Sequence, residues 1–342
     1  MRSVRNILSV ACGYVAAIIG AGFASGQEIV SFFVKYGRCS IVGVIISCVL
    51  FALFAYAVLG ACSGKGQRTY GEFLSGIMGK RLRGITEAIT IIFALSTVCV
   101  MTACSGEIGY ILFGAEKIIG AAVFIVICGV IMLMDGKKIM GINSVLGAVI
   151  IFGIIFSSLY ILRFREHQTF SREASMVVSG VTYAGYNLLT AGAVLSGMSR
   201  FLRSKREAAL AAASSGVMLF IMMTLLWGVL SIYHGKVNLG EIPMLTMTLR
   251  QSKTMGYMYS VLLFFAVLTT GVANCFGIAD MTEGKINRKY AAVITLAAGL
   301  AFSGAGVATL VNTAYRVCGW AGMIIICIIM YNSLKTMKKV AK

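Results

Sequence analysis

Proline, histidine and charged side chains are all scarce in this chain of 342 residues. It contains one proline and two histidines, and charged residues make up 12% of it, about half of their usual share in soluble proteins. So little charge cannot cover a solvated surface, which excludes a soluble globular protein. The ten cysteines include no CxxC pair, and His167 and His234 lie far apart in the sequence, so neither a metal site nor a disulfide framework is predicted.

Long apolar runs fill most of the chain, and 59% of its residues are hydrophobic. A run of about 18 or more apolar residues can cross the hydrocarbon core of a lipid bilayer as a helix. We therefore predict an all-α integral membrane protein with ten transmembrane helices. The apolar segments are 6–36, 40–63, 84–113, 117–134, 140–162, 174–197, 207–234, 255–280, 290–303 and 313–334.

Basic residues outnumber acidic ones by 30 to 12, which gives a net charge of +18. In a soluble protein such an excess would suggest binding to nucleic acid. Threading the ten segments with the N-terminus inside instead places twice as many Lys and Arg residues on the cytoplasmic side as on the outer side, as the positive-inside rule requires. We therefore expect a protein of the cell (inner or plasma) membrane with both termini in the cytoplasm and no nucleic-acid partner.

Five apolar segments precede residue 163 and five follow it. An odd number of crossings means that the second half enters the membrane from the opposite side. Residues 1–163 and 164–342 are therefore predicted to form the two five-helix halves of an inverted repeat, as in many secondary transporters. The two longer connections predict an amphipathic inner helix within 63–83, and a short outer helix within 235–254 that starts at Pro243 and could act as a lid.

The first segment contains the stretch GAGFASGQE at Gly20–Glu28. Three glycines in seven residues each weaken a helix by about 1 kcal/mol and permit unusual torsion angles. In hydrocarbon, backbone groups that an unwound helix releases are tolerated only where they line a cavity or meet a ligand. The alternative is close packing of helices through small residues. Taken alone, this stretch slightly favours the packing alternative.

The sixth segment, which opens the second half, has a polar interruption rich in Tyr, Thr and Asn at Ser179–Gly192. Such side chains are costly in lipid and should face the interior of the bundle. The interruption lies at the same place in its half as the glycine-rich stretch does in the first half. We therefore predict that both helices are broken, near Gly20–Gly26 and near Ala184–Asn187, and that the substrate site lies between the breaks.

Thr269 and Thr270 lie side by side in the middle of the eighth segment. Their hydroxyls are hard, neutral oxygen ligands that suit a sodium ion when backbone carbonyls complete its shell. The alternative is a hydroxyl bonded back to its own helix, which is common in membrane spans. The pair alone is a weak indication of an ion site.

The GAGFASGQE stretch, the pair Tyr186-Asn187 and the pair Thr269-Thr270 together resemble the YkvI family, a group of bacterial membrane proteins in the amino acid–polyamine–organocation transporter superfamily. The resemblance covers essentially the whole chain, and GAGFASGQE is its most specific part. It implies the leucine-transporter fold, with the substrate between a broken first and a broken sixth helix. One departure is Phe23, which stands where the founding fold places the Asn side chain of a second sodium site.

The resemblance also implies functional residues. Those that would bind a small-molecule substrate are Gly20, Ala21, Gly22, Tyr183, Tyr186 and Asn187. Those that would hold one sodium ion are the carbonyls of Ala16, Ile19 and Ala266 and the hydroxyls of Thr269 and Thr270. No cofactor is expected, and no metal besides sodium as the coupling ion.

Three ionisable side chains within the predicted spans, Glu28, Glu107 and Arg316, are candidates for a gate or a proton carrier. In a straight helix Glu28 would lie about 12 Å outward of the break at Gly20, where a solvated vestibule wall or an ion pair is an equal alternative. Proton-coupled relatives of this fold can use a lysine from the fifth helix, and the only counterparts here, Lys137 and Lys138, lie at its inner mouth.

Scattered acidic residues, and histidines outside the spans, argue against an enzyme. We expect a secondary active transporter of a small solute, an amino acid or a related amine, coupled to sodium. Proton coupling, a channel, and a membrane sensor that keeps the fold without transport are the open alternatives, and the oligomeric state is open too. Counterflow of substrate would distinguish a carrier from a channel.

Overall fold

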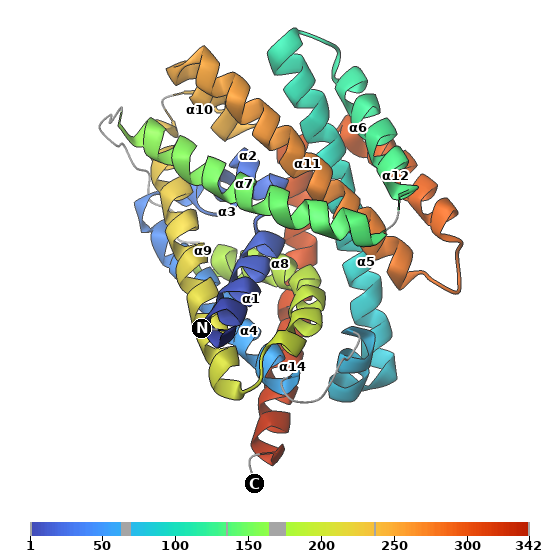
Figure 1. Ribbon diagram of the computed structural model, residues 1–342. Helices are drawn as coiled ribbons and strands as arrows, with labels where there is room; N and C mark the ends of the chain where they lie inside the picture. The colour runs from blue at the N-terminus through green and yellow to red at the C-terminus, as the bar shows by residue number, and fades with distance from the viewer. Residues whose placement is uncertain (1, 63–69, 135, 164–175, 236, 341–342) are drawn as a thin grey trace.

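The computed structural model describes residues 2–62, 70–134, 136–163, 176–235 and 237–340, and every regular element in these ranges is helical (Figure 1). Side chains are described for the same residues except 2, 3, 38, 136–145 and 338–340, so those of Lys137 and Lys138 lie outside the described part. The long helices are α1 (Arg2–Ile18), α4 (Ile41–Cys62), α5 (Tyr70–Phe113), α6 (Lys117–Met132), α7 (Gly136–Leu162), α8 (Met176–Met198), α9 (Lys205–Tyr233), α11 (Lys253–Met281), α12 (Arg288–Ser303) and α14 (Arg316–Val340).

Short helical pieces connect or interrupt the long helices. They are α2 (Ala21–Ser25), α3 (Gln27–Phe32), α10 (Pro243–Gln251), α13 (Val307–Leu310), the 3₁₀ turns η1 (Val34–Tyr36), η2 (Arg38–Ser40) and η3 (Ser199–Phe201), and the π-helical turn η4 (Val311–Tyr315). Each of the ten apolar segments coincides with one long helix or with a series of short ones. The all-helical membrane fold is therefore confirmed, whereas the count of ten crossings and the inverted repeat of 1–163 and 164–342 stay predictions.

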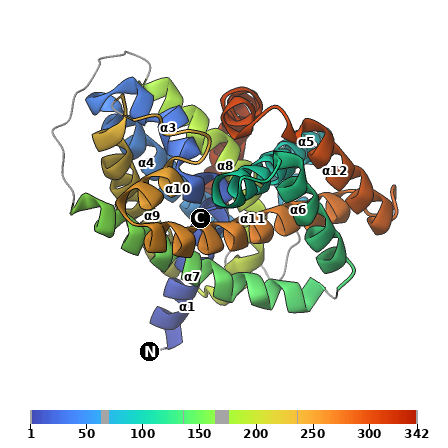
Figure 2. The same ribbon diagram turned by 90° about the horizontal axis from the view of Figure 1, so that it is seen from above.

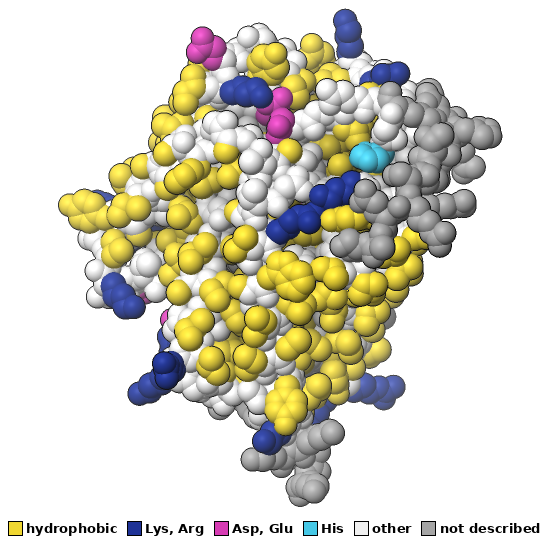
Figure 3. All heavy atoms as spheres, turned by 180° about the vertical axis from the view of Figure 1, so that it is seen from behind, with side chains coloured by type: hydrophobic (Ala, Val, Ile, Leu, Met, Phe, Trp, Pro, Cys, Tyr) yellow, Lys and Arg dark blue, Asp and Glu magenta, His cyan; other side chains and the backbone are white. Residues whose placement is uncertain are grey.

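Among the described residues, length and apolar composition allow five helical segments to cross a membrane, namely α4, α5, α9, α11 and the stretch Val307–Met337. The outer surface agrees with this, because large apolar side chains such as Phe113, Leu133 and Phe152 are at least 72% exposed. Figure 3 shows one face of the molecule, on which hydrophobic side chains cover a broad area and Lys and Arg gather mainly toward its edges. Lipid tails can cover such an apolar surface without a free-energy penalty. The chain is therefore a multi-pass membrane protein.

The helices form two groups on either side of the bundle. Figures 1 and 2 show α5, α6 and α12 together at one side and α4 and α9 together at the other, and the helices within each group pack against one another. Between these groups, α8 packs against both α4 and α14, and α11 packs against α5.

Both of the helices that the long connections predict are present. Pro243 occupies the first turn of α10, where its missing N–H is no loss. At the other connection, α5 begins with a segment that ends at Gly79, whose φ of 75° interrupts the helix before the apolar run; residues 63–69 lie outside the described part. The side of the membrane on which each helix lies stays a prediction, and so does a role of α10 as a lid.

Candidate substrate and ion site

The first membrane helix is broken twice, which confirms the predicted break at Gly20–Gly26. The helix α1 ends at Ile18, Gly20 is extended with φ −87° and ψ −176°, and Gly26 adopts a left-handed φ of 81° between α2 and α3. L side chains rarely adopt the conformation of Gly26. A side chain there would also press on Met244 Cγ at 2.9 Å, so both the backbone and the packing require glycine.

The first break releases backbone carbonyls. In a continuous helix the N–H groups of Gly20 and Ala21 would bond to the carbonyls of Ala16 and Ala17. Instead the Gly20 N–H donates to Ile18 O at 3.0 Å, and the Ala21 N–H donates to Oγ1 of Thr270 at 3.1 Å. The carbonyls of Ala16 and Ala17 thus lose their helical donors beside the break.

The sixth membrane helix is not broken, so the predicted discontinuity near Ala184–Asn187 is wrong. The helix α8 runs without interruption from Met176 to Met198. Two of its polar side chains bond back to the helix: the Asn187 amide donates to Tyr183 O at 3.0 Å, and the Thr182 hydroxyl donates to Val178 O at 2.7 Å. Such bonds accommodate these polar groups without any unwinding.

The glycines of α8 allow close contact with other helices rather than unusual torsion angles. A methyl group at Gly185 would collide with Gly319 O of α14, and a methyl group at Gly322 would collide with Gly185 O. On another face, Gly180 packs directly on Gly43 of α4. Small residues that let helix backbones approach closely are the usual basis of helix association in membranes, and they explain the glycine content of this helix.

Glu28 lies at the centre of the site rather than 12 Å outward of it, so its predicted position is also wrong. The left-handed turn at Gly26 redirects the chain, and the Glu28 side chain folds back over Gly22, where a methyl group would collide with Oε1. The Tyr186 hydroxyl of α8 donates a hydrogen bond of 2.9 Å to Glu28 Oε2. Only 5% of Glu28 is exposed, so its carboxyl group is enclosed by protein between α2, α3 and α8.

A cluster of aromatic rings lies next to this carboxyl group. The rings of Phe32, Tyr183 and Tyr186 lie within 5.6 Å of one another, centroid to centroid. Further rings pack on these three, namely those of Phe33, Phe51, Phe93 and Tyr315. The Tyr183 hydroxyl is completely buried and lies near the side chains of Glu28 and Asn187.

The structure brings three of the six predicted substrate residues, Gly22, Tyr183 and Tyr186, around Glu28. Gly20 and Ala21 instead lie against Thr270. The remaining one, Asn187, is buried next to Tyr183, and its amide nitrogen is bonded to that residue's backbone.

Of the predicted sodium ligands, Thr270 lies where α11 passes the first break. Thr270 Oγ1 contacts both Gly20 and the Ala21 N–H, so this threonine joins the eighth membrane helix to the first. The Thr269 hydroxyl donates to Ala266 O at 3.0 Å, which is the alternative bond to its own helix. Near the other end of α2, the Tyr259 hydroxyl of α11 donates to Ala24 O. Both ends of α2 are therefore fastened to α11.

The other two ionisable candidates are engaged away from Glu28. Glu107 forms an ion pair of 2.5 Å with Lys117, whose side chain is half exposed. The Arg316 guanidinium donates to Ser31 O at 2.9 Å and to the Tyr36 hydroxyl at 3.0 Å. These contacts tie α14 to the segment that follows the second break, and they give both side chains a structural role.

Some residues of the site were missed by the sequence reasoning. Phe32 carries a signal that could have identified it, because it follows Glu28 by four residues and so shares its face of α3. Phe93 and Tyr315 come from α5 and η4, far away in the sequence, and no local pattern points to them.

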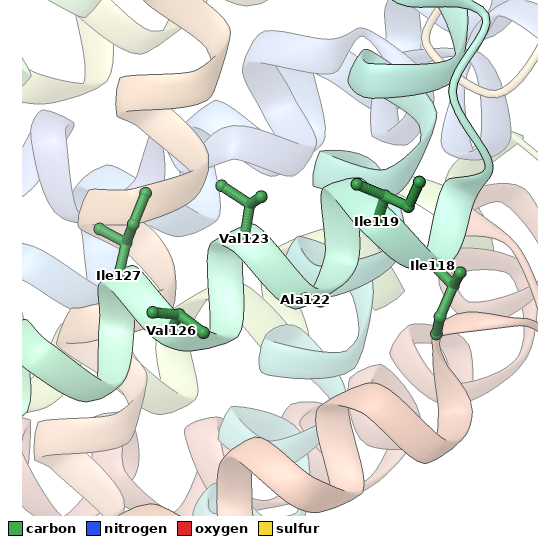
Figure 4. Close-up of a pocket in the computed structure, with 6 residues that line it drawn as sticks. All are labelled: Ile118, Ile119, Ala122, Val123, Val126 and Ile127. Carbon is green, nitrogen blue, oxygen red and sulfur yellow. The ribbon is translucent and has the colours of Figure 1, made fainter.

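A surface hollow of about 460 Å³ lies elsewhere, along α6. Its lining residues are all aliphatic, as Figure 4 shows: Ile118, Ile119, Ala122, Val123, Val126 and Ile127. With no polar group to orient a ligand, this hollow is a feature of the apolar outer surface and carries no chemistry.

Comparisons with known proteins agree with this architecture, although no family model matches the chain. YkvI of Bacillus subtilis (strain 168), an uncharacterised membrane protein, is 25% identical over 317 residues that cover 91% of this chain and 91% of YkvI. YyaD of the same organism, also uncharacterised, is 25% identical over 331 residues that cover 95% of this chain and 96% of YyaD. This chain is a homologue of both. The predicted resemblance to YkvI is thereby confirmed.

Three solved structures match this homologue of YkvI and YyaD in fold. An inward-facing structure of Mhp1 matches with a TM-score of 0.65 and 13% identity, over 95% of this chain and 75% of Mhp1. A substrate-bound, outward-open Na⁺-coupled sialic acid symporter matches with a TM-score of 0.64 and 12% identity, over 95% and 78% of the two chains. A manganese transporter of Eremococcus coleocola matches with a TM-score of 0.58 and 14% identity, over 97% and 78%. The fold is that of the leucine transporter, as expected.

Proposed function

We propose that this protein is a secondary active transporter that carries a small organic solute, an amino acid or a related amine, across the cell membrane together with sodium. The observation that carries the proposal is the break between Ile18 and Ala21, which opens the first helix beside Thr270 and next to the buried carboxyl group of Glu28. Backbone irregularity at membrane depth is tolerated where it lines a site, and broken helices hold substrate and ion in transporters.

Sodium coupling is supported by the oxygen atoms near this break. The carbonyls of Ala16 and Ala17 have lost their helical donors, and Thr270 Oγ1 keeps a free lone pair after it accepts from Ala21. The proposed ion shell consists of the carbonyls of Ala16, Ile19 and Ala266 and the hydroxyls of Thr269 and Thr270. One structural neighbour is a Na⁺-coupled symporter, which fits the same ion.

An organic solute is favoured over a transition metal, although one structural neighbour is a manganese transporter. In the described part of the chain, no group of three or more His, Cys, Asp or Glu residues could hold a metal ion. The membrane orientation proposed with this function has both termini in the cytoplasm.

Uptake into proteoliposomes tests the proposal. Amino acids and amines are screened with an imposed sodium gradient, and counterflow identifies a carrier. The Thr269→Ala and Thr270→Ala variants should weaken the affinity for sodium more than the affinity for substrate at saturating sodium. Thr336→Ala is the matched control, because its hydroxyl is bonded to Asn332 O in the same self-bonded way, far from the break.

Thr270→Ala also leaves the Ala21 N–H without a partner, which costs about 1–3 kcal/mol when the group is buried. Thr270→Ser restores the hydroxyl and should therefore restore the affinity for sodium. If wild-type uptake ignores sodium and follows an imposed pH gradient, the sodium site is wrong, and proton coupling through Glu28 takes its place.

A further inference from the structure

Glu28 is a buried carboxyl group to which no described side chain brings a positive charge. Glu28 takes part in neither the ion pair of Arg83 with Glu87 nor that of Lys117 with Glu107. The Tyr186 hydroxyl donates a hydrogen bond to Glu28, and the Tyr183 hydroxyl lies near the same carboxyl group. Enclosing a carboxylate is expensive unless an opposite charge meets it. A bound ligand with a positive charge would compensate a carboxylate at this position.

A basic side chain beside this aromatic cluster is occupied elsewhere. The Arg316 guanidinium lies 5.3 Å from the centroid of the Phe32 ring, and it donates to Ser31 O and to the Tyr36 hydroxyl instead of to Glu28. It therefore anchors α3 and η1 and leaves the charge of Glu28 uncompensated.

The position of Glu28 also bears on which solutes can be held at the break. Its carboxyl group fills the space over Gly22, directly beside the unwound backbone. A solute carboxylate bound at the same backbone would face a second negative charge in an enclosed site. Like charges that share a site disfavour each other strongly, so a solute with its own carboxylate is disfavoured there.

The walls of the site suit an organic cation. Aromatic ring faces attract ammonium groups, and the attraction is strongest where water is excluded. Phe32, Tyr183 and Tyr186 are all completely or almost completely buried, and the Tyr183 hydroxyl lies beside Glu28. A hard metal cation would instead need a full shell of oxygen ligands, which a wall of carbon rings does not provide.

We propose that the transported solute is an organic cation without a carboxylate, an amine or a quaternary ammonium compound, whose charged nitrogen pairs with Glu28 against the rings of Phe32, Tyr183 and Tyr186. The inference rests on the proposed transport function and narrows its substrate class. Among amino acids and amines, it selects the amines.

Two matched sets of probes test the charge requirement on the full chain in lipid nanodiscs, by thermal shift and by titration. The first set is choline, its uncharged carbon analogue 3,3-dimethylbutan-1-ol, and glycine betaine, which adds a carboxylate. The second set is butylamine, butan-1-ol and 4-aminobutyrate. Within at least one set, the cation should bind more tightly than the uncharged and the zwitterionic analogue by about tenfold or more.

Glu28→Gln keeps the shape of the side chain and removes its charge, so it should abolish the preference for the cation. Glu28→Asp keeps the charge and should retain the preference with weaker binding, which covers the case in which the Gln variant fails to fold. Glu283→Gln, an exposed carboxylate on the loop after α11, is the control and should bind as the wild type does.

The inference is overturned if neither cation binds, if the cation is preferred in neither set, or if the Gln variant keeps the preference. Zwitterions that bind and are taken up with sodium would overturn the substrate class while the transport function stands. Cations that bind through Glu28 without uptake or counterflow would support the site and overturn transport instead. The two failures are therefore distinguishable.

Discussion

Replacing Gly185 with alanine tests whether the glycines of α8 serve helix packing. Gly185 faces Gly319 of α14, and the added methyl group would collide with Gly319 O while approaching Met323 N at 3.1 Å. Carbonyl oxygens of a helix cannot move aside as a flexible side chain can. The two helices must therefore part at this point.

The loss of stability depends on how far α8 and α14 must move apart. The new methyl group would lie about 1 Å inside ordinary contact distance, and a gap of that size forfeits about a quarter to a half of the dispersion energy of the atoms along the crossing. Overpacking in a tight core usually costs about 1–3 kcal/mol. We expect Gly185→Ala to lower the free energy of unfolding by that amount.

Equilibrium unfolding of the purified protein in mixed micelles with SDS measures this change. Gly228→Ala in α9 is the matched control, because no atom lies within 4 Å of the added methyl group. Its stability should be unchanged or raised by up to about 1 kcal/mol, since alanine favours the helix. Gly185→Ala could instead be as stable as the control but lose solute binding. In that case the glycine is needed for α8 to unwind, and the packing explanation for the unbroken α8 fails.

Three further predictions address the site and the topology. Gly22→Ala should displace the Glu28 carboxyl group and weaken binding of the preferred solute by about tenfold or more, as measured by titration; unchanged binding would mean that the carboxyl group does not contact the solute. Arg316→Lys should lower the unfolding free energy by about 1–3 kcal/mol, because a lysine cannot keep both hydrogen bonds and the ring contact; equal stability in SDS titrations would contradict the anchoring role. Single cysteines at Arg203 and Asn238, in a background without exposed cysteines, should be labelled from the cytoplasmic and the external side, respectively, and labelling of position 203 in intact cells would overturn the topology.

Composition predicted the fold well because the bilayer constrains it strongly. Apolar runs separated by short loops gave the positions of the helices, and Pro243 gave the start of α10. The glycine-rich stretches were harder to interpret. Gly20 and Gly26 break a helix, whereas Gly180 and Gly185 lie in an unbroken one. The difference lies in what faces each glycine across the bundle, and a single sequence does not contain that information.

Only part of the site could be predicted, because its residues meet across the bundle. Counting residues along a straight helix put Glu28 far from the break, because the left-handed turn at Gly26 reverses the course of the chain. The ring cluster assembles from α3, α4, α5, α8 and η4, so its members share no local pattern. Thr270, by contrast, was correctly associated with the first helix.

The attachment of α2 to α11 has a mechanical consequence. Thr270 holds the start of α2 and Tyr259 holds its end, while α1 packs against α8 and α9. A single stretch of chain is thus divided between two sets of helices, with breaks at Gly20 and Gly26. A movement of α11 relative to α8 would carry the five residues of α2 with α11 and leave α1 behind. The unbroken α8 has no such joint, so bending would be confined to the first helix.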